Sequence, residues 1–178
     1  TFNAMNIISE KEDGVAFVNE ILPITPNQYI LQKVVVGFLF GSLSSIAAAC
    51  ICFRLSWQNY GMMLVVIVLS SFVAAMIGLF IGRFSEGLMI GVVYIKIVML
   101  VFIAVPIVSA LIGMSGPLAV ICNIVPSQPA FDGIMALSAG DIGRAVKNVG
   151  ILAIHCAAWF ALYILGNTAQ NKMCMGKM

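Results

Sequence analysis

Four long apolar runs dominate the pattern of hydrophobic and polar positions along this chain. They cover residues 34–53, 61–82, 87–113 and 149–166. A helix needs about 20 mostly apolar residues to cross the hydrocarbon core of a bilayer, and each run has that length or nearly so. The first two runs contain no Asp, Glu, Lys or Arg. The pattern therefore predicts four membrane-spanning helices.

The segment before the first run, residues 1–24, predicts an amphipathic helix. Val15, Val18, Ile21 and Leu22 recur at helical spacing and form one apolar stripe, while residues 10–13 (Glu-Lys-Glu-Asp) form a polar end. Such a helix suits the surface of a membrane. Two prolines then end it, and residues 25–28 (Thr-Pro-Asn-Gln) carry the start signal of the next helix.

Polar residues between the later runs predict how those helices begin. Ser85 can cap the third span, and Glu86 suits the positive end of its dipole. Residues 114–147 hold three prolines around an apolar stretch that is too short to span, which indicates a re-entrant or interfacial segment. Ser138 or Asp141 can cap the last helix. The expected fold is a single all-α membrane domain over residues 1–178.

Composition supports residence in lipid and excludes several classes of protein. Of the 178 residues, 62% are hydrophobic and only 9% are charged, which a water-soluble domain of this size does not tolerate. The net charge of +2 comes without a basic block, so nucleic-acid binding has no support. The chain begins with a polar stretch and with Thr1 instead of Met, so we expect a piece of a longer protein.

The motifs of common enzymes are absent from the sequence. There is no G-x-x-x-x-G-K-S/T loop to hold ATP, no G-x-S-x-G elbow and no paired-histidine metalloprotease motif. The spacing Cys50-x-Cys52, with His155 far away, is wrong for a zinc site. We expect no cofactor, no metal and no catalytic residue in this chain.

The distribution of basic residues predicts an orientation. Five basic residues fall on one side of the four expected spans, namely Lys11, Lys33, Arg83, Lys172 and Lys177, and three fall on the other, namely Arg54, Arg144 and Lys147. The side richer in Lys and Arg is usually cytoplasmic. We therefore expect both termini in the cytoplasm of a cell whose plasma membrane holds the protein, with residues 114–147 outside.

Two stretches of the sequence resemble a known family. Residues 10–14 (Glu-Lys-Glu-Asp-Gly) are followed by residues 22–29 (Leu-Pro-Ile-Thr-Pro-Asn-Gln-Tyr) and by Lys33 at the mouth of a span. Residues 85–88 (Ser-Glu-Gly-Leu) then open a span that contains Lys96 and Pro106. This order resembles the permease subunits of type-2 ATP-binding-cassette (ABC) exporters, although Val15 stands where that family often has Thr.

The resemblance implies a function and partners. This chain would be a C-terminal part with four of six spans, and residues 1–24 would hold the cytoplasmic coupling helix that touches a separate ATPase subunit. A second permease copy would complete a homo- or heterodimer in membrane lipid, and the substrate would be a drug, a lipid or a peptide-like molecule. The coupling residues would be Glu10, Lys11, Glu12, Asp13, Gly14 and Phe17. The charged ones among them equally suit a solvated surface.

Three further residues are candidates for a pathway or a gate, each with a simpler alternative. Lys96 can snorkel to the headgroups, or form an ion pair or lipid contact inside the membrane. Glu86 can be a charged loop end or part of a gate. His155 suits a hydrogen bond within the bundle, or a proton relay.

Small residues in the first span leave two interpretations open, and the function has an alternative. Gly37-x-x-x-Gly41 permits close helix packing, which serves either the chain's own fold or a dimer or pathway interface. The competing function is a non-transport scaffold or assembly subunit of a membrane complex. A proton-coupled carrier normally needs a carboxylate within its spans, and these spans have none.

Overall fold

The computed structural model describes residues 2–14, 26–52, 57–113 and 117–175, and these residues are almost entirely helical. No strand occurs in those ranges, so the expected all-α class is confirmed. The helices are α1 (Phe2–Glu12), α3 (Pro26–Cys52), α4 (Trp57–Phe84), α5 (Leu88–Ile112), α6 (Pro117–Cys122), α7 (Ser127–Ser138) and α8 (Ile142–Met175).

Four helices are long and apolar enough to cross a membrane, as the sequence predicts. The candidate spans are Gln28–Cys52, Asn59–Phe84, Leu88–Ile112 and Ile142–Gly166, each of 25 or 26 residues. At about 1.5 Å per residue, each span exceeds the roughly 30 Å thickness of the hydrocarbon core. The protein is therefore a multi-pass membrane protein.

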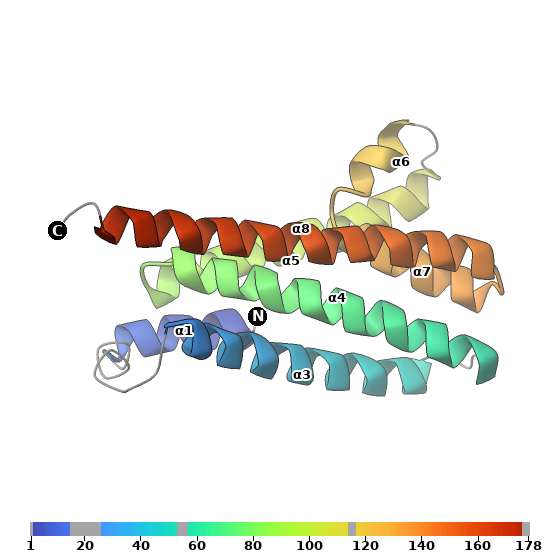
Figure 1. The fold of residues 1–178 in the computed structure, drawn as a ribbon. Coiled ribbons are helices and arrows are strands. Elements are labelled where there is room, and N and C mark those ends of the chain that lie inside the picture. Colours follow the sequence, from blue (N-terminus) through green and yellow to red (C-terminus); the bar gives the residue numbers. More distant parts are fainter. Residues whose placement is uncertain (1, 15–25, 53–56, 114–116, 176–178) are drawn as a thin grey trace.

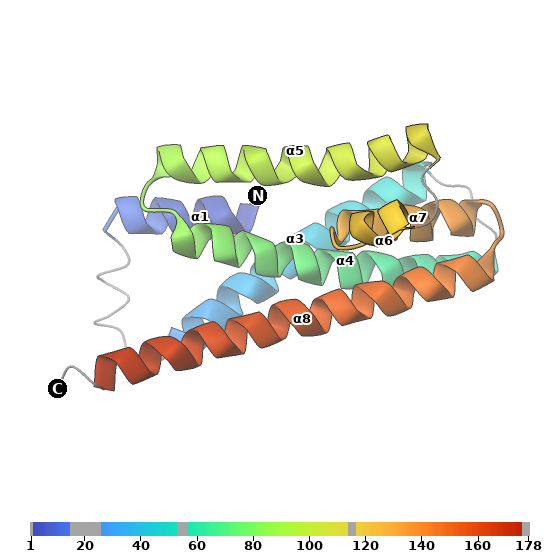
Figure 2. The same ribbon diagram turned by 90° about the horizontal axis from the view of Figure 1, so that it is seen from above.

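Helix α4 lies at the centre of the bundle. Half of its most apolar window is buried, against 11% or less for the corresponding windows of α3, α5 and α8. Figures 1 and 2 show α3, α5 and α8 arranged around it. Met63, Val66 and Ile67 of α4 pack against α7 and α8 in the main core. The outer helices expose large apolar side chains such as Leu100 of α5, which suits lipid or another membrane protein.

The last membrane helix begins seven residues before its expected apolar start at Val149. Helix α8 starts at Ile142, and the Asp141 side chain accepts a hydrogen bond from the Arg144 backbone N–H at 3.0 Å. This confirms Asp141 as a cap. The first turns of α8 are polar, and hydropathy alone therefore missed them. Within the region 114–147, α7 packs against α4 and α8, and its Leu137 is 1% exposed. A re-entrant course for this region stays a prediction.

Helix α1 packs into the bundle and does not lie on its surface. Ala4 and Ile8 are fully buried, and α1 contacts α3, α4 and α5. Glycines allow this approach: a β-carbon on Gly82 of α4 would lie 2.9 Å from the Ile7 Cβ, and one on Gly37 of α3 would lie 2.9 Å from the Asn3 Cβ. The apolar stripe from Val15 to Leu22, on which the surface prediction rested, lies outside the described residues.

The connection between α4 and α5 differs from the expectation in one respect. The Ser85 hydroxyl donates to the Ile81 carbonyl at 2.7 Å and so closes the end of α4 instead of capping α5. The first N–H of α5 is bound by Glu12, a residue distant in the sequence. Helix α5 then continues through the buried Pro106 to Ile112, and Gly113 ends it in the left-handed region at φ +60°.

Candidate functional site

Lys11, near the end of α1, binds the carboxyl end of α4. Its Nζ donates to the carbonyls of Gly82 at 2.7 Å, Arg83 at 2.8 Å and Ser85 at 3.1 Å. Carbonyls in the last turn of a helix lack partners within the helix and carry the negative end of its dipole. Burial and the nearby Arg83 charge lower the pKa of Lys11, so the carbonyls offset only part of the cost of placing the charge there.

Glu12, the next residue, binds the amino end of α5. Its Oε1 accepts a hydrogen bond of 2.6 Å from the Leu88 backbone N–H. A carboxylate is favourable at this position because the free N–H groups carry the positive end of the dipole. Lys11 and Glu12 thus hold both sides of the turn between α4 and α5, each with the sign of charge that its helix end attracts.

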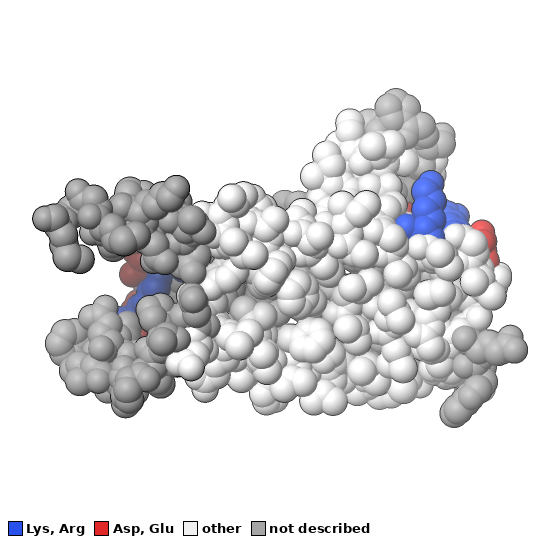
Figure 3. All heavy atoms as spheres, in the orientation of Figure 1, with Lys and Arg blue, Asp and Glu red and all other residues white. Residues whose placement is uncertain are grey.

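Glu10 connects α1 to α3. Its carboxylate forms an ion pair with Lys33 and accepts a hydrogen bond from the Tyr29 hydroxyl, and Lys33 also donates to the Asn6 side chain. The side chains of Lys33 and Glu10 are only 14% and 25% exposed. We call Glu10, Lys11, Glu12, Tyr29 and Lys33 the charged junction. Figure 3 shows charged atoms at both ends of the visible face and an uncharged belt between them.

The other expected coupling residues lie beside the charged junction. Asp13 accepts a hydrogen bond of 3.1 Å from the Ser9 hydroxyl. Gly14 follows α1 with φ +69°, a conformation that glycine adopts without strain. Both residues are exposed, so a partner can reach them. Phe17 lies outside the described residues.

The three candidate pathway or gate residues do not come together. Lys96 is exposed on α5, and Glu86 is exposed in the turn before it. His155 Nε2 lies 2.8 Å from the Asn123 carbonyl, which is the hydrogen bond within the bundle that the sequence suggested as the simpler alternative. Within the described ranges, no three His, Cys, Asp or Glu side chains gather as metal ligands would.

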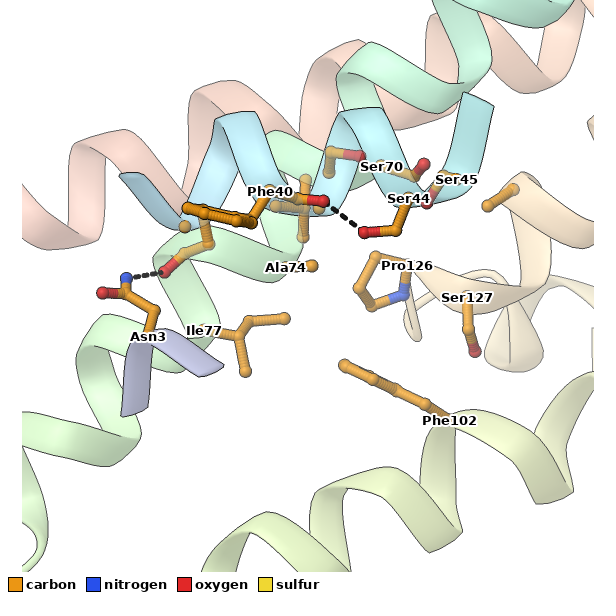
Figure 4. A pocket seen from close by; sticks show the side chains of 16 residues that line it. Asn3, Phe40, Ser44, Ser45, Ser70, Ala74, Ile77, Phe102, Pro126 and Ser127 are labelled. Carbon is orange, nitrogen blue, oxygen red and sulfur yellow. Dashed lines mark hydrogen bonds between the residues drawn. The ribbon is translucent and has the colours of Figure 1, made fainter. Parts of the chain in front are cut away.

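A cavity of about 580 Å³ lies within the membrane part of the bundle. Residues of α1, α3, α4, α5 and α7 line it, and Figure 4 shows Ser44 and Ser45 on one side and Phe102 on the other. Gly37 and Gly41 belong to the lining, while Gly37 also packs on Asn3. The small residues of α3 therefore pack within the chain and border the cavity as well.

The cavity is apolar with a few hydroxyl groups. Ser44 donates to the Phe40 carbonyl, and Ser70 donates to the Ile67 carbonyl at 3.0 Å. The Ser127 hydroxyl is buried and has no hydrogen-bond partner in the described part of the chain. An apolar space with a few polar groups is the usual lining of a small-molecule site. Ser70, Ser71 and Ser127 belong to no recognisable sequence motif, so the sequence did not identify them as residues of a cavity.

One of three comparisons with known proteins identifies the family of the chain. Residues 1–165 match the family described as "ABC-2 family transporter protein". Comparison with curated proteins and with solved structures found no match. The family match spans α1, α6, α7, the first three candidate spans and all but the last residue of the fourth. The chain therefore belongs to the ABC-2 family of transporter proteins, as a membrane-embedded permease component.

Proposed function

We propose that the chain is the permease subunit of an ATP-driven exporter and that residues 10–14 and Phe17 couple it to a separate ATPase subunit. Permeases of this family work with ABC ATPases, which supports the kind of partner. The observation that carries the proposal is the pair of bonds from Lys11 to the end of α4 and from Glu12 to the start of α5. A displacement of the residues after α1 is transmitted through these bonds to α4 and α5.

The bonds of Glu10 extend this displacement to a third helix, α3. Glu10 binds Lys33 and Tyr29, so α3 moves with α1 as well. All three helices line the cavity, together with α1 and α7. Rigid-body movement of packed helices is a common way to switch between two states of a site. In this scheme, nucleotide-driven closure of the ATPase changes the shape of the cavity.

The lining of the cavity supports an amphipathic substrate. Phe40, Val73, Ile77 and Phe102 offer apolar surface, and the serines offer hydrogen bonds. A drug, a lipid or a peptide-like molecule has this mixed character. We further propose that a second permease copy, identical or related, completes the pathway within the lipid of the plasma membrane, and that both termini face the cytoplasm.

Isolation of the native complex tests the proposal. The full chain is purified from its native membrane in mild detergent, and an ABC ATPase identified by mass spectrometry is expected with it. Spin labels on the exposed residues Leu39 of α3 and Leu100 of α5 then report the distance between these helices. We expect ATP to change this distance in the native complex and the double variant Lys11→Met/Glu12→Gln to lose that change while it keeps the ATPase.

A matched variant and two outcomes make the test decisive. Lys147→Met removes an exposed cation at the other end of the bundle, and it should keep the ATP-driven change. Absence of any ATPase from the native complex would favour the scaffold alternative. An ATP-driven change that survives in the double variant would show that the charged junction does not transmit movement.

A further inference from the structure

A second cavity, of about 360 Å³, lies away from the charged junction and is lined mainly by polar side chains. It lies between the end of α5, α6 and the residue after it, α7, and the start of α8. Figure 1 shows α6 projecting from the bundle there. The polar residues of its lining are Ser109, Asn123, Gln128, Asp132 and Arg144.

Hydrogen-bond acceptors in this polar cavity lack donors. Gln128 is 3% exposed, and its Nε2 donates to the Ser109 hydroxyl at 3.1 Å and to Asp132 Oδ2 at 3.0 Å. Its Oε1 is buried and has no partner in the described part of the chain, and the same is true of Asn123 Oδ1. The amide orientation of Gln128 is fixed because a carboxylate only accepts. A buried acceptor without a donor is unfavourable, so N–H or O–H groups that a ligand brought to these atoms would remove that cost.

The charges of the cavity define the ligand further. Asp132 adds a negative charge next to the unpartnered acceptors, which favours a cationic donor. Arg144 is exposed at the same cavity and can pair with an anionic group, often through two parallel hydrogen bonds. We propose that this polar cavity binds a primary ammonium group that carries a phosphate or carboxylate a few bonds away. A quaternary ammonium has no N–H to donate, so the cavity should discriminate against it.

The depth of the cavity suits two sources of such a ligand. Ser109 follows the first residue of α5 by 21 positions, or about 32 Å along a helix. The hydrocarbon core is about 30 Å thick, which places the cavity near the headgroup level. The headgroup of phosphatidylethanolamine and a soluble molecule such as phosphoethanolamine offer the same chemistry. The proposal concerns binding alone, so it stands whether or not the charged junction couples to an ATPase.

Native mass spectrometry of the purified full chain tests the proposal. The four probes are phosphatidylethanolamine, phosphatidylcholine with the same acyl chains, phosphoethanolamine and phosphocholine. We expect the ethanolamine form to bind at least about tenfold more tightly than the matched choline form, which corresponds to the loss of one charge-assisted hydrogen bond. Preferential binding of phosphoethanolamine over phosphocholine would identify a soluble ligand, and a preference for ethanolamine that appears only with the two lipids would identify a headgroup.

Two variants and one matched control distinguish the cavity from unspecific binding. Asp132→Asn keeps the shape and removes the charge, and it should weaken ethanolamine binding by about tenfold. Gln128→Leu should do the same, and Asp132→Asn still tests the proposal if that variant fails to fold. Asp141→Asn removes a carboxylate outside the lining and keeps a good cap, so binding should not change. Equal binding of the ethanolamine and choline forms, or full binding by Asp132→Asn, would overturn the proposal.

Discussion

The charged junction and the polar cavity differ in whether their polar groups have hydrogen-bond partners. At the charged junction, Glu10, Lys11 and Glu12 all bind partners on other helices. In the polar cavity, the side-chain amide oxygens of Gln128 and Asn123 find no donor in the described residues. A cluster with satisfied charges holds helices in a fixed relation, whereas buried acceptors without donors require an explanation, which we propose is a ligand. The contrast separates the region that we propose transmits movement from the region that we propose binds a ligand.

The largest expected effect on stability comes from breaking the Glu10–Lys33 pair. Lys33→Met leaves the carboxylate of Glu10 mostly buried beside Tyr29 and without its cation. Removal of one partner of a buried pair costs about 3–5 kcal/mol, and the partial exposure of both groups favours the lower end, about 3 kcal/mol. Equilibrium unfolding in mixed micelles measures this loss.

Lys147→Met is the control for this variant, because Lys147 is exposed on α8. A change within about 0.5 kcal/mol is expected there, as for most surface positions. Equal free energies of unfolding for the two variants would mean that residues 10–13 are only a solvated face, and the contrast with the polar cavity would disappear.

The substitution Gly82→Val should separate α1 from α4. The new β-carbon would lie 2.9 Å from the Ile7 Cβ, a branch point that cannot rotate away. Overpacking of this kind costs about 2 kcal/mol. Gly61→Val, in the same helix but with open space around it, should cost little. Unfolding of both variants in micelles gives the comparison, and a cost at Gly82 no larger than at Gly61 would show that α1 packs loosely.

A smaller effect should show which carboxylate stabilises the start of α5. Glu12→Gln weakens the bond to the Leu88 N–H and removes a charge that favours the helix dipole, at a cost of about 1 kcal/mol. Glu86 lies closer in the sequence, but the Leu88 N–H is bound by Glu12. Glu86→Gln should therefore cost less than about 0.5 kcal/mol in the same unfolding assay. The reverse order would restore the simple prediction that the local residue serves the helix end.

The sequence predicted the features that depend on local composition and missed those that depend on distant pairs. Hydropathy located the four spans because each lies within one run of residues, and Asp141 was identified because a cap acts on the next few residues. The bond from Lys11 to the Gly82 carbonyl joins residues 71 positions apart. The spacing of residues along the sequence cannot predict such a distant pair. Ser85, a local candidate cap for α5, instead binds the end of α4.

Distant pairs also explain why the sequence predicted some of the candidate site residues but not their partners. The resemblance rested on residues 10–14, Tyr29 and Lys33 alike, yet it did not show that Glu10 binds Tyr29 and Lys33. Gln128 lies between Pro126 and Pro129, in a region that was interpreted as a re-entrant or interfacial segment, and no sequence pattern there indicated that its side chain is buried. A buried amide becomes informative only when the atoms around it are known.

The smallest expected effect is that of His155→Gln, at the residue that connects the last span to the polar cavity. Its Nε2 donates to the backbone carbonyl of Asn123 at 2.8 Å, and the side-chain Oδ1 of Asn123 is one of the two unmet acceptors. Glutamine keeps an N–H of similar reach, so His155→Gln should lower stability by about 0.5 kcal/mol and change ethanolamine binding little. Phenylalanine has no donor, and His155→Phe should cost about 1 kcal/mol. If glutamine instead abolishes a proton-dependent activity while stability is kept, His155 acts as the proton relay that the sequence left open, because glutamine cannot titrate.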